Sequence, residues 1–284
     1  MVERLKAAIE KARTERERVE REPAGAGPGS AAGPASGAAD PVARTGGALA
    51  DLPEISVPPA TAGDSRLVAL DRRAPANAAF DLLRTRLAGV CAANNWRRIG
   101  VTSPTKGCGK STVTMNLAFS FARQPGVTVA LLDLDLKAPT LAAMLGQAGA
   151  PRPIAPLLEG RVAPAGHLVR LGDQLAVGLN TQPVRDSAEL LAAPGTARAI
   201  AAVETALAPH VTLLDLPPML VSDDVLTMRD RIDAFVLVVG AGISKARDIE
   251  ACERLLEGST LLGVVLNKCV DDLGAGYGEA YYAA

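Results

Sequence analysis

A run of glycine, lysine and hydroxyl residues, GCGKST at 107–112, lies between an apolar stretch and a second, helix-like stretch. Glycines let backbone N–H groups approach phosphate oxygens closely, and the start of a following helix adds positive potential. In such a loop Lys110 would neutralise β- and γ-phosphate charge, and the Ser111 hydroxyl would ligate magnesium. The run therefore predicts binding of ATP with Mg²⁺, although Pro104 stands where the strict pattern has glycine. The residues expected to bind ATP are Thr105, Lys106, Gly107, Cys108, Gly109, Lys110, Ser111 and Thr112.

Two residues of this loop also have a plainer interpretation. Lys106 adds a cation beside the glycines, but a solvated surface lysine would give the same pattern. Cys108 lies near a helix N-terminus, a position that lowers the pKa of a thiol. A small space-filling residue accounts for Cys108 equally well.

Acidic residues end two further apolar runs. The run VALLDLDL delivers Asp133 and Asp135, and the run HVTLLDL delivers Asp215. A buried strand does not end in carboxylates for packing reasons, because unpaired buried charge is costly. Asp215 fits the pattern of an aspartate that holds Mg²⁺ through its water shell. Asp133 and Asp135 would face Mg²⁺ or a reacting hydroxyl, and helix capping is the alternative for this pair.

Alternating elements must position these residues. From Arg66 onward, apolar runs bounded by turn residues alternate with amphipathic stretches. Continuous apolar strands separated by helices indicate a parallel sheet covered on both faces. We therefore expect an α/β fold, a doubly wound, mostly parallel sheet of the P-loop NTPase type, which binds ligands at the carboxyl ends of its strands. The expected strands are 98–103, 127–134, 175–180, 211–216, 234–240 and 261–267, and the expected helices lie near 76–93, 110–123, 188–207 and 245–256.

The composition divides the chain into four parts. Residues 1–22 alternate opposite charges with a thin apolar stripe, which predicts a helix, either simply exposed or docking on a partner. Residues 23–65 are rich in Ala, Gly, Pro and Ser and predict a flexible linker. Residues 66–270 form the expected P-loop domain, and residues 271–284 form a flexible tail.

Charge, cysteines and hydropathy exclude several classes of protein. The formal net charge of −1 argues against whole-protein attraction to nucleic acid or anionic lipid. The four cysteines show no CxxC pairing and predict free thiols, and the distant His167 and His210 predict no metal site. No apolar run is long enough to span a bilayer, and the charged N-terminus has no signal-peptide core, so we expect a cytoplasmic chain.

All three tyrosines lie within the last eight residues: Tyr277, Tyr281 and Tyr282. Tyrosine normally serves cores and interfaces, yet these three stand among Gly and Ala without a core pattern. Their position indicates a function outside the folded core. The alternative is a tail whose tyrosines are incidental.

Taken together, TSPTKGCGKST followed by NLA, then LLDLDLKAP, LLDLPP and GVVLNK, resembles the bacterial tyrosine autokinases of exopolysaccharide and capsule assembly. These kinases are related to the deviant-Walker ATPases that include the Min and Par proteins. The resemblance covers residues 66–284, with weaker matches at AFDLLRTRL and PVRDSAELL. It implies an ATP-dependent protein-tyrosine kinase that phosphorylates its own C-terminal tyrosines and regulates polysaccharide polymerisation and export.

The resemblance also implies roles for individual residues. Lys110 and Ser111 would bind phosphate and magnesium, and Asn267 would contact the adenine ring. Of Asp133 and Asp135, one carboxylate would activate the tyrosine hydroxyl. The implied catalytic set is Lys110, Asp133, Asp135 and Asp215, the implied metal set is Ser111, Asp133 and Asp215, and the implied phosphate acceptors are Tyr277, Tyr281 and Tyr282.

In the split form of the family, the kinase is a separate cytoplasmic chain that a membrane polysaccharide co-polymerase recruits to the inner face of the membrane and activates. The family's oligomer-interface helix carries Glu, Arg and Arg where this chain has Ala78, Asp81 and Arg84. Only Arg84 matches, which leaves ring-shaped self-association open. Par and Min ATPases carry a signature lysine at the place of Thr105, so the kinase branch is favoured.

Two other functions stay compatible with the sequence. A partitioning or positioning ATPase would hydrolyse ATP and switch its association state, but a basic DNA-binding surface is not evident. An ATP-binding scaffold without kinase activity would explain the altered interface helix. The tyrosine tail and Thr105 favour the autokinase.

Overall fold

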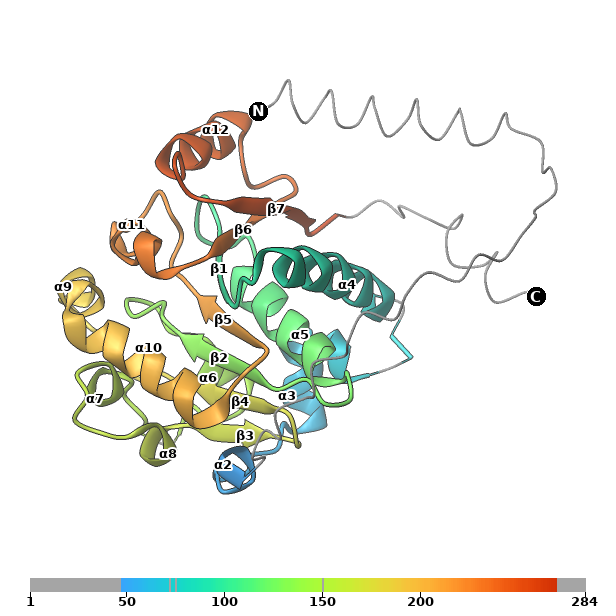
Figure 1. Ribbon diagram of the computed structural model, residues 1–284. Helices are drawn as coiled ribbons and strands as arrows, with labels where there is room; N and C mark the ends of the chain where they lie inside the picture. The colour runs from blue at the N-terminus through green and yellow to red at the C-terminus, as the bar shows by residue number, and fades with distance from the viewer. Residues whose placement is uncertain (1–46, 72, 75, 150, 270–284) are drawn as a thin grey trace, which may run out of the picture. The chain divides into compact units, whose positions relative to one another are not determined.

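Seven strands form one sheet in the order β3-β4-β2-β5-β1-β6-β7 (Figure 1). The computed structural model describes residues 47–71, 73–74, 76–149 and 151–269. Neighbouring strands within these residues are parallel except β3 and β4, which are antiparallel. The strands are β1 Arg98–Thr102, β2 Val129–Asp133, β3 Val169–Leu171, β4 Leu175–Gly178, β5 Val211–Asp215, β6 Ala234–Gly240 and β7 Leu261–Asn267. The doubly wound, mostly parallel sheet expected from the sequence is confirmed.

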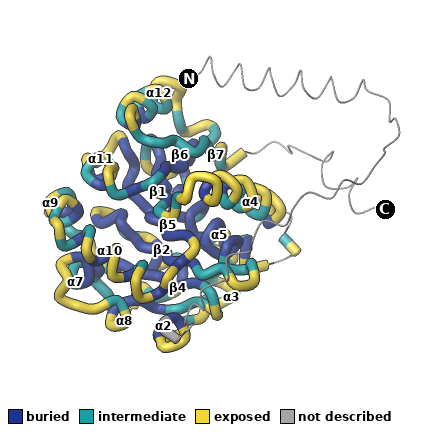
Figure 2. The backbone as a smooth tube through the Cα atoms, viewed as in Figure 1, coloured by how far each residue is buried: buried dark blue, intermediate teal, exposed yellow. Residues whose placement is uncertain are grey.

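Buried side chains on both faces of the sheet explain why these segments are strands. Every residue of β2, β5 and β6 is buried, as the dark central strands in Figure 2 show. One hydrophobic core joins the sheet to helices α4 Asn77–Asn94 and α5 Lys110–Ala122. The other core joins the opposite face to α10 Pro194–Leu207 and α12 Ala246–Leu255. Both faces of the sheet are therefore covered, as a parallel sheet requires.

Shorter helical segments complete the described part of the chain. The expected helix 188–207 is instead two helices, because Pro194 follows Ala193, whose ψ of 143° is extended. The shorter segments are α2 Gly47–Ala50, α3 Pro59–Asp64, η1 Val68–Leu70, α6 Leu141–Met144, α7 Ala155–Leu158, α8 Pro164–His167, α9 Ser187–Ala192, α11 Asp224–Met228 and η2 Arg229–Arg231.

Part of the expected linker belongs to the folded domain. The segment was expected to be flexible from residue 23 to residue 65, but residues 47–65 pack on the sheet. Leu49 and Leu52 are buried in the core with α10, and the Ile55 amide donates a hydrogen bond of 2.9 Å to the carbonyl of Arg170 in β3. These few apolar side chains outweigh the Ala/Gly/Pro-rich composition around them. Residues 1–22, residues 23–46 and the tail 271–284 lie outside the described residues.

Candidate nucleotide-binding site

A loop between β1 and α5 carries the predicted phosphate-binding residues. Gly107 and Gly109 have φ values of 82° and 85°, in the left-handed region where glycine is unstrained. A Cβ at position 109 would lie 2.3 Å from the Nδ2 atom of Asn267, so any other residue here would displace the Asn267 side chain and adopt a strained φ. The helix α5 begins at Lys110 and points its free N–H groups into the loop. The backbone of this loop therefore has the glycine conformations and the helix N-terminus that close approach to a phosphate requires.

Lys110 lies at the centre of an acidic cluster. Its side chain is 9% exposed, and Nζ lies 2.8 Å from Oδ2 of Asp135 and 3.4 Å from Oδ2 of Asp215. Burial alone would lower the pKa of Lys110, but the carboxylates of Asp215 and Asp135 outweigh it and raise the pKa. The lysine is therefore a fixed cation, and it also donates a hydrogen bond of 3.0 Å to Ser111 Oγ.

Asp215 ends β5 and is fully buried. Its Oδ2 atom accepts a hydrogen bond of 2.6 Å from Ser111, and its Oδ1 atom accepts one of 3.2 Å from Thr114. Burial raises the pKa of Asp215, while Lys110 and the Ser111 hydroxyl oppose the rise. Thr114 escaped the sequence analysis, although its place one helical turn after Lys110 puts it on the same face of α5.

Asp133 ends β2 beside Asp215, because the parallel register pairs these two residues directly. Its Oδ2 atom accepts a hydrogen bond of 3.2 Å from the Leu141 amide, whereas its buried Oδ1 atom has no partner among the described residues. Burial, reinforced by the charge of Asp215, raises the pKa of Asp133 well above its ordinary value despite the nearby Lys110. A buried oxygen without a partner, next to a second carboxylate and the Ser111 hydroxyl, fits a hydrated Mg²⁺ ion.

No group of three or more His, Cys, Asp or Glu side chains in the described ranges could hold a metal by itself. A magnesium ion here would take its remaining ligands from nucleotide phosphates and water, which is how Mg²⁺ is commonly bound in nucleotide sites. Ser111, Asp133 and Asp215 are the side chains that could contribute.

Asn267 braces the phosphate loop from the edge strand β7. Its Nδ2 atom donates a hydrogen bond of 2.9 Å to the carbonyl of Cys108. Burial would raise the pKa of Cys108, but hydrogen bonds with Ser244 and Thr105 outweigh it and lower the pKa. Cys108 is nearly fully buried, as expected of a space-filling residue. All four cysteines are free thiols, as predicted.

A pocket of about 490 Å³ opens in front of the loop, a volume suited to a small-molecule ligand. Thr105, Asp133, Asp215 and Asn267 do not line the pocket and lie behind or beside its wall. The predicted residues that line it directly are Lys106, Gly107, Cys108, Gly109, Lys110, Ser111, Thr112 and Asp135. Ser103, where the nucleotide-binding segment expected from the sequence begins, also lines it. So do residues that the sequence analysis missed, namely Lys137, Ala138, Thr140, Met144, Pro217, Pro218, Val221 and Ser222.

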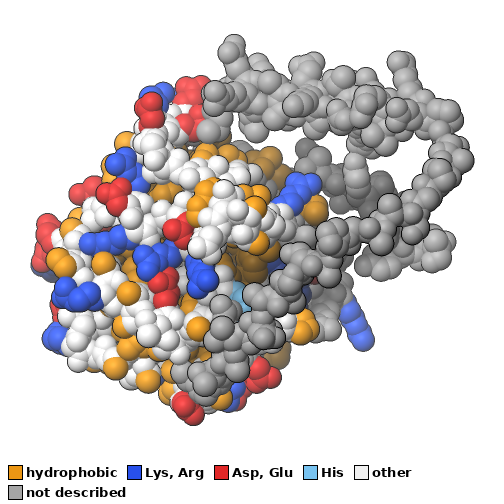
Figure 3. Space-filling view, in the orientation of Figure 1, with side chains coloured by type: hydrophobic (Ala, Val, Ile, Leu, Met, Phe, Trp, Pro, Cys, Tyr) orange, Lys and Arg blue, Asp and Glu red, His pale blue; other side chains and the backbone are white. Residues whose placement is uncertain are grey.

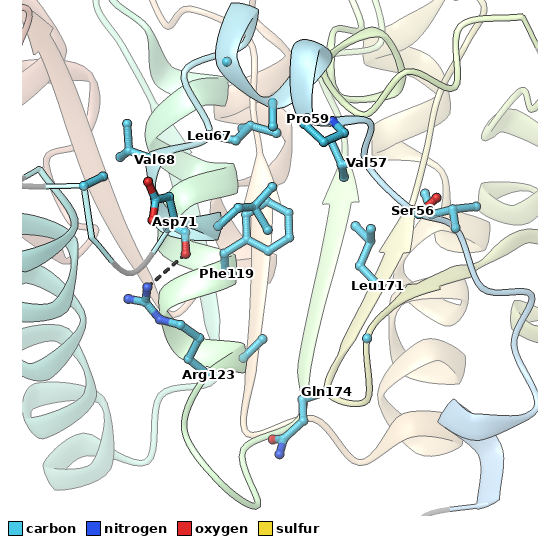
Figure 4. Close-up of a pocket in the computed structure, with 18 of the residues that line it drawn as sticks. Ser56, Val57, Pro59, Leu67, Val68, Asp71, Phe119, Arg123, Leu171 and Gln174 are labelled. Atoms are coloured by element: carbon cyan, nitrogen blue, oxygen red, sulfur yellow. Dashed lines mark hydrogen bonds between the residues drawn. The ribbon is translucent and has the colours of Figure 1, made fainter.

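A second pocket, of about 1060 Å³, lies at the far end of α5 (Figure 4). Phe119, Leu67 and Leu171 form apolar walls, and Arg123 donates a hydrogen bond of 2.9 Å to the carbonyl of Ala69. The length of α5 places this pocket about 18 Å from the phosphate loop. Because its lining is largely apolar and includes no residue of the acidic cluster, it is not part of the nucleotide site.

The remaining sequence predictions have mixed outcomes. His167 is buried, and its Nε2 atom donates a hydrogen bond of 2.9 Å to the carbonyl of Leu179, so it is a structural histidine. Asp81 on α4 forms ion pairs with Arg84 and Arg123 within the chain. The tail tyrosines Tyr277, Tyr281 and Tyr282 lie outside the described residues.

On the face shown in Figure 3, acidic and basic side chains are interspersed, with no concentrated basic patch among the coloured residues. Among the described residues, no helix has the length and apolar character to cross a membrane.

The parallel sheet, the glycine-rich loop and the carboxylates at adjacent strand ends define a P-loop nucleotide-binding protein. A family model described as "ParA: NUBPL iron-transfer P-loop NTPase" matches residues 95–267. The chain thus belongs to this family of P-loop NTPases, and among its relatives it groups with the bacterial tyrosine-protein kinases.

Named relatives support this grouping. Tyrosine-protein kinase CpsD of Streptococcus pneumoniae is 30% identical over 60% of this chain and 75% of its own length. Tyrosine-protein kinase CpsD of Streptococcus agalactiae is 28% identical over 64% of this chain and 79% of its own length. The kinase domain of the Escherichia coli tyrosine kinase ETK is 20% identical, with a TM-score of 0.62 over 74% of this chain and 84% of that one. The last likeness supports the fold alone.

Proposed function

We propose that this chain is an ATP-dependent protein-tyrosine autokinase that phosphorylates its own C-terminal tyrosines and thereby regulates exopolysaccharide or capsule polymerisation and export. The observation that carries the proposal is the cluster of Lys110 with Asp133, Asp135 and Asp215 behind the phosphate loop. The similarity to proteins named tyrosine-protein kinase supports the choice of tyrosine as the acceptor.

Phosphate binding rearranges the contacts of Lys110. In the present structure the ammonium group contacts two carboxylates, and ATP would offer it the β- and γ-phosphate oxygens instead. The Ser111 hydroxyl and the Asp215 carboxylate would hold Mg²⁺, which neutralises charge on the phosphates. The backbone N–H groups at the start of α5 would bind phosphate oxygens without a change in the fold.

Asp133 has the properties of a general base. Its Oδ1 atom is buried without a partner among the described residues and could accept a proton. The carboxylate would accept the proton of the tyrosine hydroxyl as the tyrosine oxygen bonds to the γ-phosphorus. The bond between that phosphorus and the β-bridging oxygen breaks, ADP leaves, and phosphotyrosine remains. Asp135 would hold Lys110 in place through their contact of 2.8 Å.

The proposal includes a membrane partner. A polysaccharide co-polymerase would recruit the chain to the inner face of the cell membrane and order its active site. Arg84 and Asp81 pair with residues of the same chain, so the proposed autokinase would depend more on its partner than on a homo-oligomer. Nucleic acid is not an expected partner, since the charge is balanced.

The test is to incubate the purified chain with labelled ATP and Mg²⁺, alone and with the cytoplasmic segment of its co-polymerase, and to map phosphotyrosine by mass spectrometry. We expect phosphate on Tyr277, Tyr281 or Tyr282. Lys110→Ala should abolish ATP binding and labelling, whereas Arg198→Ala, an exposed cation on α10, should change neither. Replacing the three tyrosines by phenylalanine should remove the label and leave ATP binding intact.

A positioning ATPase is the second candidate, because the matched family model carries the ParA name. Hydrolysis of ATP by the wild-type chain without phosphotyrosine, even with the co-polymerase segment present, would favour this candidate and contradict the autokinase. Tight ATP binding without hydrolysis or transfer would favour a scaffold.

A further inference from the structure

A second lysine stands on the rim of the nucleotide pocket, away from Lys110. Lys137 follows β2 and lines the same pocket as the phosphate loop, with its side chain 44% exposed. Its Nζ atom donates a hydrogen bond of 3.0 Å to Ser222 Oγ and lies 3.5 Å from Oδ1 of Asp224. The pocket is therefore lined by the buried Lys110, by the exposed Lys106 of the phosphate loop and by Lys137 on its rim.

Asp224 explains how this exposed lysine is held. The carboxylate is fully buried at the start of α11, and it accepts a hydrogen bond from Ser187 Oγ, whose distances to Oδ2 and Oδ1 are 2.9 and 3.0 Å. One hydroxyl proton does not compensate a buried negative charge, which requires a cation as well. Among the described residues, Lys137 is the cation within 4 Å of Asp224. The charge of Asp224 is thus committed to Lys137.

The backbone on both sides of Lys137 is also anchored. The Leu136 carbonyl accepts a hydrogen bond of 2.8 Å from the Val184 amide, and the Ala138 amide donates one of 3.2 Å to Asp135 Oδ1. A change of partner at Lys137 would therefore involve only its side chain, whose ammonium group also lies 4.0 Å from Oδ1 of Asp223. Its neighbours Ser222 and Ala138 line the pocket with it, so the ammonium group can turn toward a ligand without leaving the rim.

We propose that Lys137 is a second phosphate-binding cation of this site, which contacts the terminal phosphoryl group of a nucleoside triphosphate, and that Asp224 is its positioning residue. The inference rests on the proposed nucleotide binding and adds to it a means of distinguishing triphosphate from diphosphate. During transfer, charge spreads over the oxygens of the moving phosphoryl group. A cation on the rim of the pocket, in addition to the buried Lys110, would stabilise that charge.

The rival interpretation is that Lys137 merely ties the loop after β2 to α11. The two interpretations predict different effects on ATP and ADP binding when Lys137 is replaced. A tether acts on the fold, so its loss would weaken ADP and ATP binding alike. A cation for the terminal phosphate acts only on the triphosphate, so its loss would weaken ATP binding and leave ADP binding unchanged.

The experiment measures, by calorimetry on the full chain, the affinities for Mg²⁺ with a non-hydrolysable β,γ-imido ATP analogue and for Mg²⁺ with ADP. For Lys137→Ala we expect the ratio of analogue affinity to ADP affinity to fall about tenfold or more, since one charge-assisted contact is lost. Lys137→Arg should keep most of the ratio, and Arg198→Ala, the matched control, should keep all of it. An unchanged ratio for Lys137→Ala, or an equal loss for both nucleotides, overturns the proposal.

A double-mutant cycle tests the role of Asp224. Asp224→Asn preserves the acceptor for Ser187 but removes the charge, and it should lower the same affinity ratio. In the Lys137→Ala background, Asp224→Asn should lower the ratio no further, because Asp224 acts through Lys137. Additive losses would contradict the positioning role. Circular dichroism checks that each variant is folded, and Ser187→Ala offers a milder perturbation if Asp224→Asn unfolds.

The binding readout separates this inference from the proposed kinase. Lys137 can be tested on a chain that never phosphorylates tyrosine, because the affinity ratio requires no transfer. Failure of the wild-type chain to bind either nucleotide would contradict the proposed function and this inference together. Binding with an unchanged ratio would contradict the inference alone.

Discussion

Replacement of Asp133 by asparagine should make the nucleotide-free protein more stable while it removes phosphoryl transfer. Asparagine has the size and shape of aspartate, and it can still accept the hydrogen bond from the Leu141 amide. The unpartnered Oδ1 of Asp133 could become an NH₂ group, and the repulsion between the Asp133 and Asp215 carboxylates would be lost. The substitution thus removes a buried negative charge without opening a cavity.

The size of the effect follows from the cost of a buried group that lacks a partner. Leaving such a group unsatisfied costs about 1–3 kcal/mol, and more if it is charged. For a domain of roughly 150–250 residues, 1 kcal/mol shifts Tm by about 2–4 °C. Asp133→Asn should therefore raise the Tm of the nucleotide-free chain by about 2–12 °C.

The gain should depend on pH. The pKa of Asp133 is raised in the folded state, so protonation favours folding, and the wild type loses that stability as pH rises through the folded pKa. The advantage of Asp133→Asn is therefore largest above the folded pKa. It should shrink as pH falls and vanish near the unfolded pKa of about 3.9.

The assay is thermal unfolding followed by circular dichroism, in EDTA and without nucleotide, from pH 4 to pH 8. Asp173→Asn is the matched control, because the Asp173 side chain is 97% exposed and its neutralisation should leave Tm nearly unchanged. In parallel, Asp133→Asn should retain ATP binding and lose autophosphorylation by about 100-fold or more. A Tm at or below that of the wild type at pH 8 would refute the electrostatic reasoning, and a normal phosphorylation rate would refute the catalytic role.

Three further predictions concern the fold around the site. Gly109→Ala should weaken ATP binding about tenfold or more in calorimetry, because the new Cβ would clash with Asn267 at a φ of 85°. The control Gly126→Ala, at a φ of 76° with no atom within 4 Å of the new Cβ, should leave the affinity for ATP unchanged. Equal effects of the two substitutions would contradict the role of the clash. Burial lowers the pKa of His167, so the unfolded chain binds the imidazole proton more tightly and the free energy of unfolding should fall as pH drops below about 6.5. In urea unfolding, His167→Gln should remove this part of the dependence of stability on pH. An unchanged pH dependence would exclude His167 as its source. A chain that starts at residue 47 should unfold cooperatively with wild-type stability. A chain that starts at residue 66 should lose several kcal/mol of unfolding free energy, because Leu49 and Leu52 are removed from the core. Equal stabilities of the two chains would show that residues 47–65 do not stabilise the fold.

The central strands β2, β5 and β6 were predictable because each is a short, mostly apolar run, and all of their residues are buried in the sheet. The acidic strand ends were predictable for the same reason. A carboxylate directly after VALL or VTLL has to lie at the carboxyl edge of the sheet, and parallel register then brings Asp133 beside Asp215. Local sequence therefore determined the centre of the site, because neighbouring strands carry it.

Other features depend on partners that lie far away in the sequence. The edge strand β3 is only three residues long and gains its identity from β4, to which a turn at Gly172 joins it. Leu52 lies in a segment of low complexity and becomes a core residue only because α10 offers it a surface. Lys137 and Asp224 are separated by 87 positions (224 − 137), and no spacing rule connects them. Such contacts follow from the fold and cannot be read before it is known.

The residues that contact the phosphate loop stand on strands of different kinds, central strands on one side and an edge strand on the other. The acidic half of the site stands on β2 and β5, each of which has a strand on both sides, whereas Asn267 stands on β7, which pairs only with β6 among the described residues. Edge strands open locally at a lower free energy than central ones. Loosening of β7 would release the Cys108 carbonyl and relax the glycine turn, while the carboxylates keep their places. Hydrogen exchange should therefore be faster in β7 than in β2 or β5.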